Sequence, residues 1–439
     1  MLAVIVFIII LGVLIFVHEL GHFVTARRNG IRASEFGFGF PPRIVGFQFL
    51  TGQEEKEELE LESMEVETAD VKSDDREIIT KTVTQKFREV LRNVPVKRWR
   101  IIWGAEDGDD EREMMDLDAA HKRKLAGGTI YSLNWIPLGG FVKIKGEDGG
   151  NAADTDSFAA KSAWVRTKVL GAGVMMNFVL AWFLLSIIFI IGAPQAVDPN
   201  MPRQDISGLK IQISDVALGT PASMAGIKIG DEIIGIKLGT GENIKPQNVK
   251  EVQEVVNAHK GEKIIFSIKR GGQALALDIV PRVDAPKDQG ALGVSLAETV
   301  IVSYPWYQAI WEGLKTTLNL IEMIFMALVG IIYGLLMGHG AGADVSGPIG
   351  IAVLTKEVTG LGLVYVLQFT ALLSVNLGII NILPIPALDG GRILFILIEK
   401  LKGSPVSAKV EQTFHSIGFA LLIGLLILVT FRDVLHYVK

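Results

Sequence analysis

The chain has 439 residues, of which 49% are hydrophobic and 21% are charged, and its formal net charge is −5. An acidic chain gives no support for nucleic-acid binding, which favours basic surfaces. The sequence contains no cysteine, which excludes disulfides and thiolate metal sites, so a bound metal must use histidine or carboxylate ligands. Runs long enough to span a bilayer, about 20 residues, predict a polytopic α-helical membrane protein. They lie near residues 2–26, 168–193, 313–337, 361–383 and 414–431.

The first run, residues 2–26, contains the motif His18-Glu19-Leu20-Gly21-His22. On a helix, His18 and His22 lie one turn apart on the same face, where both imidazoles can bind a zinc ion. Glu19 can then take a proton from a water activated by the metal. Ionisable residues are costly in lipid unless they serve a function, so we predict a hydrolytic zinc site inside a membrane. The run lacks a basic start and a clear cleavage site, which favours an uncleaved span over a signal peptide.

Basic residues set the predicted orientation of this span. Arg27, Arg28 and Arg32 follow it closely, and positive charges favour the cytoplasmic side. The amino terminus is then outside, and His18 lies near the cytoplasmic end of the helix.

Residues 51–126 are strongly charged, and we expect a cytoplasmic insertion or linker there, or else a regulatory or partner-binding segment. Within it, residues 54–75 are acidic and predict a solvated, partly disordered chain. Residues 77–92 have a helix-forming composition, and residues 106–118 form a second acidic cluster.

Residues 127–150 alternate polar and apolar side chains around Pro137-Leu138-Gly139-Gly140, the pattern of two strands joined by a turn. We expect a membrane-associated β-hairpin with an exposed edge whose backbone groups are free to pair. A protease can hold an extended peptide along such an edge. The predicted substrate-binding residues on this edge are Leu138, Gly139, Gly140, Phe141 and Val142.

The second span, residues 168–193, carries Gly171, Gly173 and Asn177, which suit either close helix packing or a place near the active site. Residues 203–285 then alternate strand and helix patterns and include Ala225-Gly226-Ile227-Lys228-Ile229-Gly230-Asp231-Glu232-Ile233. This pattern resembles an α/β PDZ domain, a fold that receives peptide ends or extended peptides along a strand edge. The second span returns the chain across the bilayer, so we expect this domain outside the cytoplasm.

A late motif runs from Asn381 through Pro384 and Pro386 to Asp389. The prolines interrupt any helix and leave backbone groups that only a protein interior or a watery cavity can satisfy. A zinc site with two histidines needs a third protein ligand and an open position for water. Asp389, an isolated carboxylate before two flexible glycines, is the best candidate. Alone it would suggest a cap or turn residue, but the first motif favours a ligand.

Together the two motifs resemble the site-2 protease family of intramembrane zinc metalloproteases, in its bacterial RseP-type branch. Further matching segments are residues 36–42, the hairpin, and residues 346–350 and 374–378. The resemblance implies a Zn²⁺ cofactor bound by His18, His22 and Asp389, with Glu19 as the base. It also implies a multi-pass protein of the bacterial inner membrane, with transmembrane proteins or peptides as substrates. The residues it brings near the substrate, besides the hairpin, are Asn177, Asn381, Pro384 and Pro386.

Three features depart from that family. The chain has length for one PDZ domain where a well-known member has two, and the insertion of residues 51–126 interrupts a loop that is usually short. Val174 follows Gly173 where the family commonly has proline, so only Gly173 and Asn177 correspond.

The side of the membrane on which each segment must lie predicts four transmembrane helices. Asp389 must reach the depth of His18, so the segment 361–391 must run inward as the third span, and residues 414–431 form the fourth. No single full crossing then fits at 313–337, and we expect that run to lie on the outer membrane surface or to re-enter it. Lysines 400, 402 and 409 fall on the inner side.

The predicted reaction is hydrolysis of a peptide bond in or near a transmembrane segment, releasing a regulator such as an anti-sigma factor after a first cut. The same chemistry could instead clear leftover signal peptides. A protein of another class, a membrane-anchored PDZ scaffold with an inactive metal site, is the remaining alternative. The presence of Glu19 together with both histidines and Asp389 argues against it.

Overall fold

The structure is a computed structural model of the whole chain. It describes all residues except 1, 74–75, 105–122, 197–208, 218, 287–289, 339–346, 405 and 438–439. The acidic cluster 106–118 therefore lies outside the described residues. The chain divides into two compact units: residues 26–161 form a sheet unit, and residues 1–25 with 162–439 form a helical unit that carries a second sheet.

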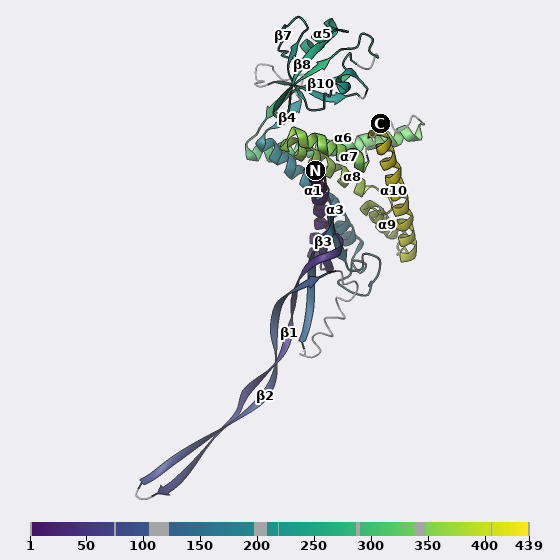
Figure 1. Cartoon of the computed structure of the whole chain (residues 1–439). Helices are drawn as coiled ribbons and strands as arrows, with labels where there is room; N and C mark the ends of the chain where they lie inside the picture. Colours follow the sequence, from purple (N-terminus) through teal and green to yellow (C-terminus); the bar gives the residue numbers. More distant parts are fainter. Residues whose placement is uncertain are drawn as a thin grey trace. The chain divides into compact units, whose positions relative to one another are not determined.

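Three strands in the order β2–β1–β3 build the sheet unit: β1 (Ala33–Ser73), β2 (Arg76–Trp103) and β3 (Arg123–Ile144). β1 and β2 pair as a long, twisted, two-stranded ribbon (Figure 1). The helix predicted for 77–92 and the disorder predicted within 54–75 are therefore wrong. Backbone pairing runs along both stretches, from Glu54 opposite Val94 to Lys72 opposite Glu77, so each stretch is paired as a strand.

The predicted hairpin of residues 127–150 takes a different form. Residues 35–38 of β1 pair both with 130–133 and with 140–143 of β3, so they lie between the two arms. Gly37 makes this possible, because a Cβ there would strike the side chains of Ser132, Asn134 and Phe141. The arm 140–143 has no strand partner on its other side within the described residues. The expected free edge is present, but the two arms do not form a hairpin with each other.

The base of this sheet has a largely polar buried face and an apolar exposed face. On the buried face, Arg43 donates two hydrogen bonds to the Glu35 carboxylate, at 2.9 and 2.8 Å, and Asn134 donates to the Gly39 carbonyl at 2.9 Å. A sheet in water normally buries its apolar face instead. The exposed large side chains of the other face are Phe38, Phe47, Trp99, Ile101, Trp103, Tyr131, Leu133 and Trp135.

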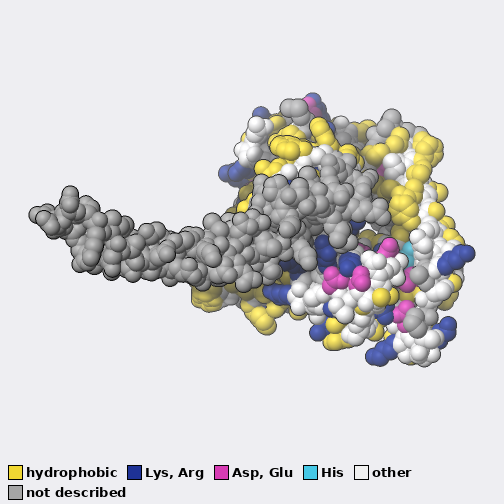
Figure 2. Space-filling model, turned by 90° about the horizontal axis from the view of Figure 1, so that it is seen from below, with side chains coloured by type: hydrophobic (Ala, Val, Ile, Leu, Met, Phe, Trp, Pro, Cys, Tyr) yellow, Lys and Arg dark blue, Asp and Glu magenta, His cyan; other side chains and the backbone are white. Residues whose placement is uncertain are grey.

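Five helices of the described residues are long and apolar enough to cross a membrane. They are α1 (Leu2–Arg28), α3 (Ala163–Ile191), α6 (Trp306–Leu336), α8 (Leu363–Ile382) and α10 (Ala408–Tyr437). Each falls on one of the five apolar runs of the sequence. Hydrophobic side chains form a broad strip on one flank of the molecule seen from below (Figure 2), as expected of a surface that faces lipid.

The late motif does not lie within one helix. α8 ends at Ile382, residues 383–388 are irregular, and a separate helix α9 (Asp389–Lys402) begins at Asp389. The prolines at 384 and 386 account for the break, because they lack the N–H that a helix requires. The expected single span 361–391 is corrected accordingly: α7 (Pro348–Leu361) precedes α8, and only α8 is long enough to cross.

The second sheet covers more of the chain than the predicted 203–285. Its main path follows the order β4–β10–β5–β6–β8–β9, with β7 on β6, and α4 and α5 accompany it. β4 lies before the predicted domain in the sequence and β10 lies after it. Both belong to the sheet, because β10 pairs with β5 and β4 pairs with β10. The bounds are β4 (Ala193–Ala196), β5 (Lys210–Val216), α4 (Pro221–Met224), β6 (Glu232–Lys237), β7 (Asn243–Ile244), α5 (Val249–Ala258), β8 (Ile264–Arg270), β9 (Gln273–Ile279) and β10 (Val294–Val302).

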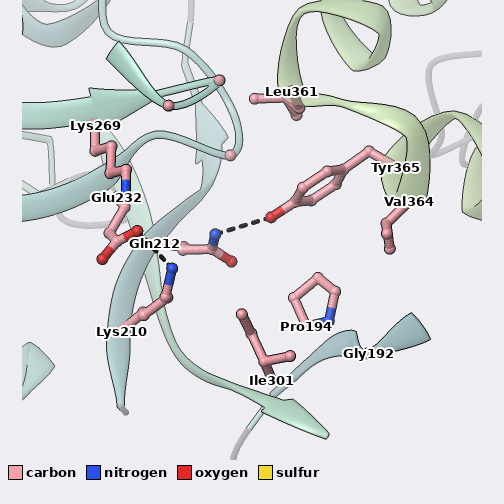
Figure 3. Close-up of a pocket in the computed structure, with 13 residues that line it drawn as sticks. Gly192, Pro194, Lys210, Gln212, Glu232, Lys269, Ile301, Leu361, Val364 and Tyr365 are labelled. Carbon is pink, nitrogen blue, oxygen red and sulfur yellow. Dashed lines mark hydrogen bonds and ion pairs between the residues drawn. The ribbon is translucent and has the colours of Figure 1, made fainter. Parts of the chain in front are cut away.

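This second sheet meets the start of α8. The Gln212 amide donates to the Tyr365 hydroxyl at 2.9 Å, across a cavity that Pro194, Ile301 and Val364 also line (Figure 3). A Cβ at Gly230 would strike Leu361. The amino-terminal end of α8 therefore lies at the same end of the helical unit as the second sheet.

Candidate metal centre

Three side chains far apart in sequence converge in the helical unit. The Asp389 carboxylate Oδ2 lies 3.0 Å from Nε2 of His18 and 3.4 Å from Nε2 of His22. The two Nε2 atoms are 3.1 Å apart. Among the described residues, these three form the group of histidine and carboxylate side chains that could hold a metal ion. The structure therefore brings together the histidines of α1 and the first residue of α9, as the two motifs predict.

Contacts with α3 orient both imidazoles. Nδ1 of His22 donates to the Val169 carbonyl at 2.9 Å, which leaves the Nε2 lone pair free for a metal. Nδ1 of His18 lies 3.2 Å from the Asn177 amide, which is fully buried and whose Oδ1 has no other hydrogen-bond partner. Because the two ends of an amide are interchangeable by a half-turn, Oδ1 can accept from His18 Nδ1 and free its Nε2 as well.

Glycines let α1 and α3 approach closely at this point. A Cβ on Gly21 would meet the Ala172 carbonyl, and one on Gly173 would strike Nε2 of His22 and lie 2.8 Å from Cε1 of His18. Gly171, by contrast, has nothing within 4 Å of an added Cβ. Of the two alternatives for this stretch of α3, Gly173 and Asn177 lie beside the histidines, whereas Gly171 does not.

The glycines after Asp389 also serve close packing. A Cβ at Gly390 would strike the carbonyls of Ile382 and Leu383, and one at Gly391 would strike the Ile385 carbonyl. Both glycines are buried in the first turn of α9. They were predicted as flexible, but they permit the irregular segment to fold tightly onto the helix that begins with Asp389.

The donor set fits zinc. Two neutral imidazoles and a carboxylate are ligands of catalytic zinc sites, at about 2.0–2.2 Å from the metal. In a tetrahedron with such bonds, ligand atoms lie about 3.3 Å apart. The three observed separations, 3.0, 3.1 and 3.4 Å, match one face of that tetrahedron. Three protein ligands of this kind leave the fourth position of a catalytic zinc site for a water or a substrate.

Other predicted residues lie at different distances from this group. Glu19 is half-buried on α1 between the two histidines, and the Asn381 amide lies 3.5 Å from Nε2 of His18. Pro384 is exposed and Pro386 half-buried in the irregular segment before Asp389. The predicted residues of the substrate edge belong to the sheet unit, where Gly140, Phe141 and Val142 pair with β1. These edge residues are Leu138, Gly139, Gly140, Phe141 and Val142.

Sequence reasoning missed several contacts of the site. The Ser374 hydroxyl of α8 donates to the Asn177 carbonyl at 2.7 Å, so α8 supports the residue that orients His18. Nδ1 of His415 accepts from the Ala387 N–H at 2.8 Å. No metal-ligand spacing marks either residue, and only the packing of helices distant in sequence reveals them.

Comparisons with known proteins agree with this geometry. The chain matches the family described as Peptidase family M50 over residues 6–56 and 119–425. It is 30% identical to the zinc metalloprotease RasP of Geobacillus kaustophilus, with 98% of this chain and 96% of the relative covered. It is also 30% identical to the regulator of sigma-W protease RasP of Bacillus subtilis, with 98% of each covered. A putative zinc metalloprotease of Agrobacterium fabrum is 25% identical over 98% of this chain and 94% of the relative.

Proposed function

Because the chain belongs to peptidase family M50 and is an intramembrane zinc metalloendopeptidase of the site-2 protease type, we propose that His18, His22 and Asp389 bind the zinc and that Glu19 is the general base. The convergence of the three ligand atoms within 4.8 Å of one another carries this assignment. Zinc, when bound, lowers the pKa of a coordinated water and polarises the scissile carbonyl.

Glu19 takes the proton of the attacking water and later delivers it to the leaving amine. It follows His18 directly in the sequence of α1 and is not among the three proposed ligands. Asn177 and Val169 hold the imidazoles with Nε2 directed at Asp389. Asn381, whose amide lies 3.5 Å from His18, and the two prolines before Asp389 line the approach of the substrate.

The sheet unit associates with the membrane and supplies the substrate edge. Its exposed aromatic face and its buried Arg43–Glu35 pair are the arrangement of a sheet that faces lipid rather than water. A substrate helix must unwind locally to expose its scissile carbonyl. The free edge beyond residues 140–143 can pair with the unwound peptide, with Leu138 and Gly139 at the turn that leads into it.

Four of the five long helices cross the membrane. Arg166 at the start of α3 pairs with Glu399 near the end of α9 at 2.6 Å, so these two ends lie on one side. α10 leaves that side and is about 45 Å long at 1.5 Å per residue, so its far end lies on the other side. There, buried Asp433 accepts hydrogen bonds from the N–H groups of Gly347 and Gly350.

The contact between Asp433 and Gly347 indicates on which side α6 lies. α6 begins shortly after β10 of the second sheet, and that sheet lies at the outer ends of α3 and α8. The chain that follows α6 reaches Gly347 beside Asp433. Both flanks of α6 are then on the outer side, which supports a helix that lies on or re-enters that surface. Cysteine labelling from outside at residues 337 and 338, which are both exposed, tests this; protection of both from an impermeant reagent in intact cells, with labelling after lysis, would contradict it.

The second sheet belongs to a PDZ domain on the outer side of a bacterial inner membrane. This domain receives peptide ends or extended peptides. Its strand-and-helix pattern and its position at the outer ends of α3 and α8 support this assignment. The metal centre lies toward the inner side, since the basic residues Arg27 and Arg28 end α1 about 10 Å beyond His22.

The substrate is a single-span membrane protein that releases a regulator, such as an anti-sigma factor already shortened by a first cut. The relative from Bacillus subtilis is named a regulator of sigma-W protease, which supports this class of substrate. Removal of leftover signal peptides is the competing role.

The test uses the purified full chain in proteoliposomes with two substrates, a shortened anti-sigma factor and a signal-peptide remnant. Wild-type protein should cut the first within its span, and Glu19→Gln should abolish cleavage while retaining the fold and about one zinc. Normal cleavage by Glu19→Gln would overturn the mechanism. Cleavage of the signal-peptide remnant alone would overturn the substrate assignment and leave the chemistry intact.

A further inference from the structure

The segment that carries Asp389 has an unusual backbone. Ala387, two residues before the carboxylate, has φ of 69°, in the left-handed region that residues other than glycine rarely adopt. Such a conformation is strained and persists only where surrounding structure holds it. The neighbouring prolines lack N–H groups, so few backbone donors are available to anchor the segment.

His415 of α10 supplies an anchor. Its Nδ1 accepts the Ala387 N–H at 2.8 Å. Because Nδ1 accepts this bond, the proton of the neutral ring lies on Nε2, which is buried without a hydrogen-bond partner and lies 4.0 Å from the Glu411 carboxylate one turn earlier. The ring is largely buried, with 17% of its side chain exposed, and it packs 5.7 Å from the ring of Phe395 in α9.

A second contact fixes α10 against the same segment. Gly418, which follows His415 by nearly one turn on α10, is buried, and a Cβ there would strike Pro386. The hydrogen bond and this close approach together hold the segment from two points on one face of α10. Both contacts are with the segment before Asp389 and not with a metal ligand, so they act on the Asp389 carboxylate through the backbone.

We propose that His415 is a positioning residue for the metal centre: by accepting the Ala387 N–H it holds the 384–388 segment in the conformation that places the Asp389 carboxylate beside His18 and His22. The inference rests on the proposed role of Asp389 as a zinc ligand. Groups that support a ligand through hydrogen bonds typically change metal affinity or activity by 10- to 100-fold when removed.

The experiment measures zinc release from the purified full chain into excess chelator, alongside kcat and KM. His415→Ala should release zinc about 10-fold faster and should lower kcat with KM nearly unchanged. His415→Asn can present its Oδ1 where Nδ1 lies and should restore both, whereas His415→Gln places its amide one bond too far and should not. Ser416→Ala, an exposed neighbour on α10, serves as the control for substitution in this helix.

The outcomes separate the inference from the proposed function. Zinc release at the wild-type rate from His415→Ala, or equal failure of the folded Asn and Gln variants, would overturn the positioning role. If Asp389→Ala itself retained zinc as tightly as wild-type protein, the ligand assignment would fall, and the positioning role with it. If His415→Ala does not fold, the comparison of His415→Asn with His415→Gln decides the question alone.

Discussion

Gly173→Ala should disable the metal centre although it adds one methyl group to a transmembrane helix. The added Cβ would lie 2.8 Å from Cε1 of His18 and still closer to Nε2 of His22, whereas ordinary contact begins at about 3.4 Å. To remove the clash with His18 alone, the helix or the imidazole must move by about 0.6 Å (3.4 minus 2.8). The clash with His22 requires a larger movement. A misplacement of about 1 Å in a catalytic site can cost about 100-fold in rate.

We therefore expect kcat/KM of Gly173→Ala to fall about 100-fold and its zinc to be released at least 10-fold faster. The assay is cleavage of a single-span substrate in proteoliposomes, with zinc release followed by a chromogenic chelator. Gly171→Ala is the matched control, because it lies on the same helix and its Cβ has nothing within 4 Å. Wild-type activity and zinc retention in Gly173→Ala would refute the account of the contact between α3 and the histidines.

Other substitutions probe the supports of the centre. Asn177→Leu should weaken zinc binding by 10- to 100-fold, because it removes the partner of His18 Nδ1, while Asn177→Asp should retain much of it; equal zinc affinity in all three proteins would contradict this role. Asp433→Ala should destabilise the helical unit by roughly 2–6 kcal/mol in a detergent unfolding assay, because two buried N–H groups at the start of α7 lose their acceptor at about 1–3 kcal/mol each. A change below about 0.5 kcal/mol would show that water replaces the carboxylate. Removal of zinc by a chelator should abolish cleavage, and added zinc should restore it; activity in zinc-free protein would exclude the proposed mechanism.

The convergence of the three candidate metal ligands could be predicted from the sequence because its signal is local and chemical. His18 and His22 lie at helical spacing in an apolar run, and an isolated carboxylate at 389 supplies what their zinc site lacks. The structure brings these three together without any correction. The long apolar helices are predicted for a similar reason, since length and hydropathy alone define them.

The sheet unit was harder to predict because its pairing depends on residues distant in sequence. Composition at 77–92 favours a helix, but the antiparallel partner at 56–72 makes it a strand. The two arms around Pro137 suggest a hairpin, yet residues 35–38 lie between them. Supports such as Asn177 and His415 were likewise beyond single-sequence reasoning, because a lone amide or histidine in a helix carries no spacing signal until its neighbours are known.

Zinc stoichiometry in the purified full chain tests the central claim most directly. We predict about one zinc per chain in the wild-type protein and in Glu19→Gln, and loss of that zinc in His18→Ala, His22→Ala and Asp389→Ala, each with its helical content unchanged. His22 and Asp389 lie 367 residues apart in the sequence (389 minus 22). Retention of a full equivalent of zinc by the folded Asp389→Ala protein would contradict the claim that their two motifs build one metal centre.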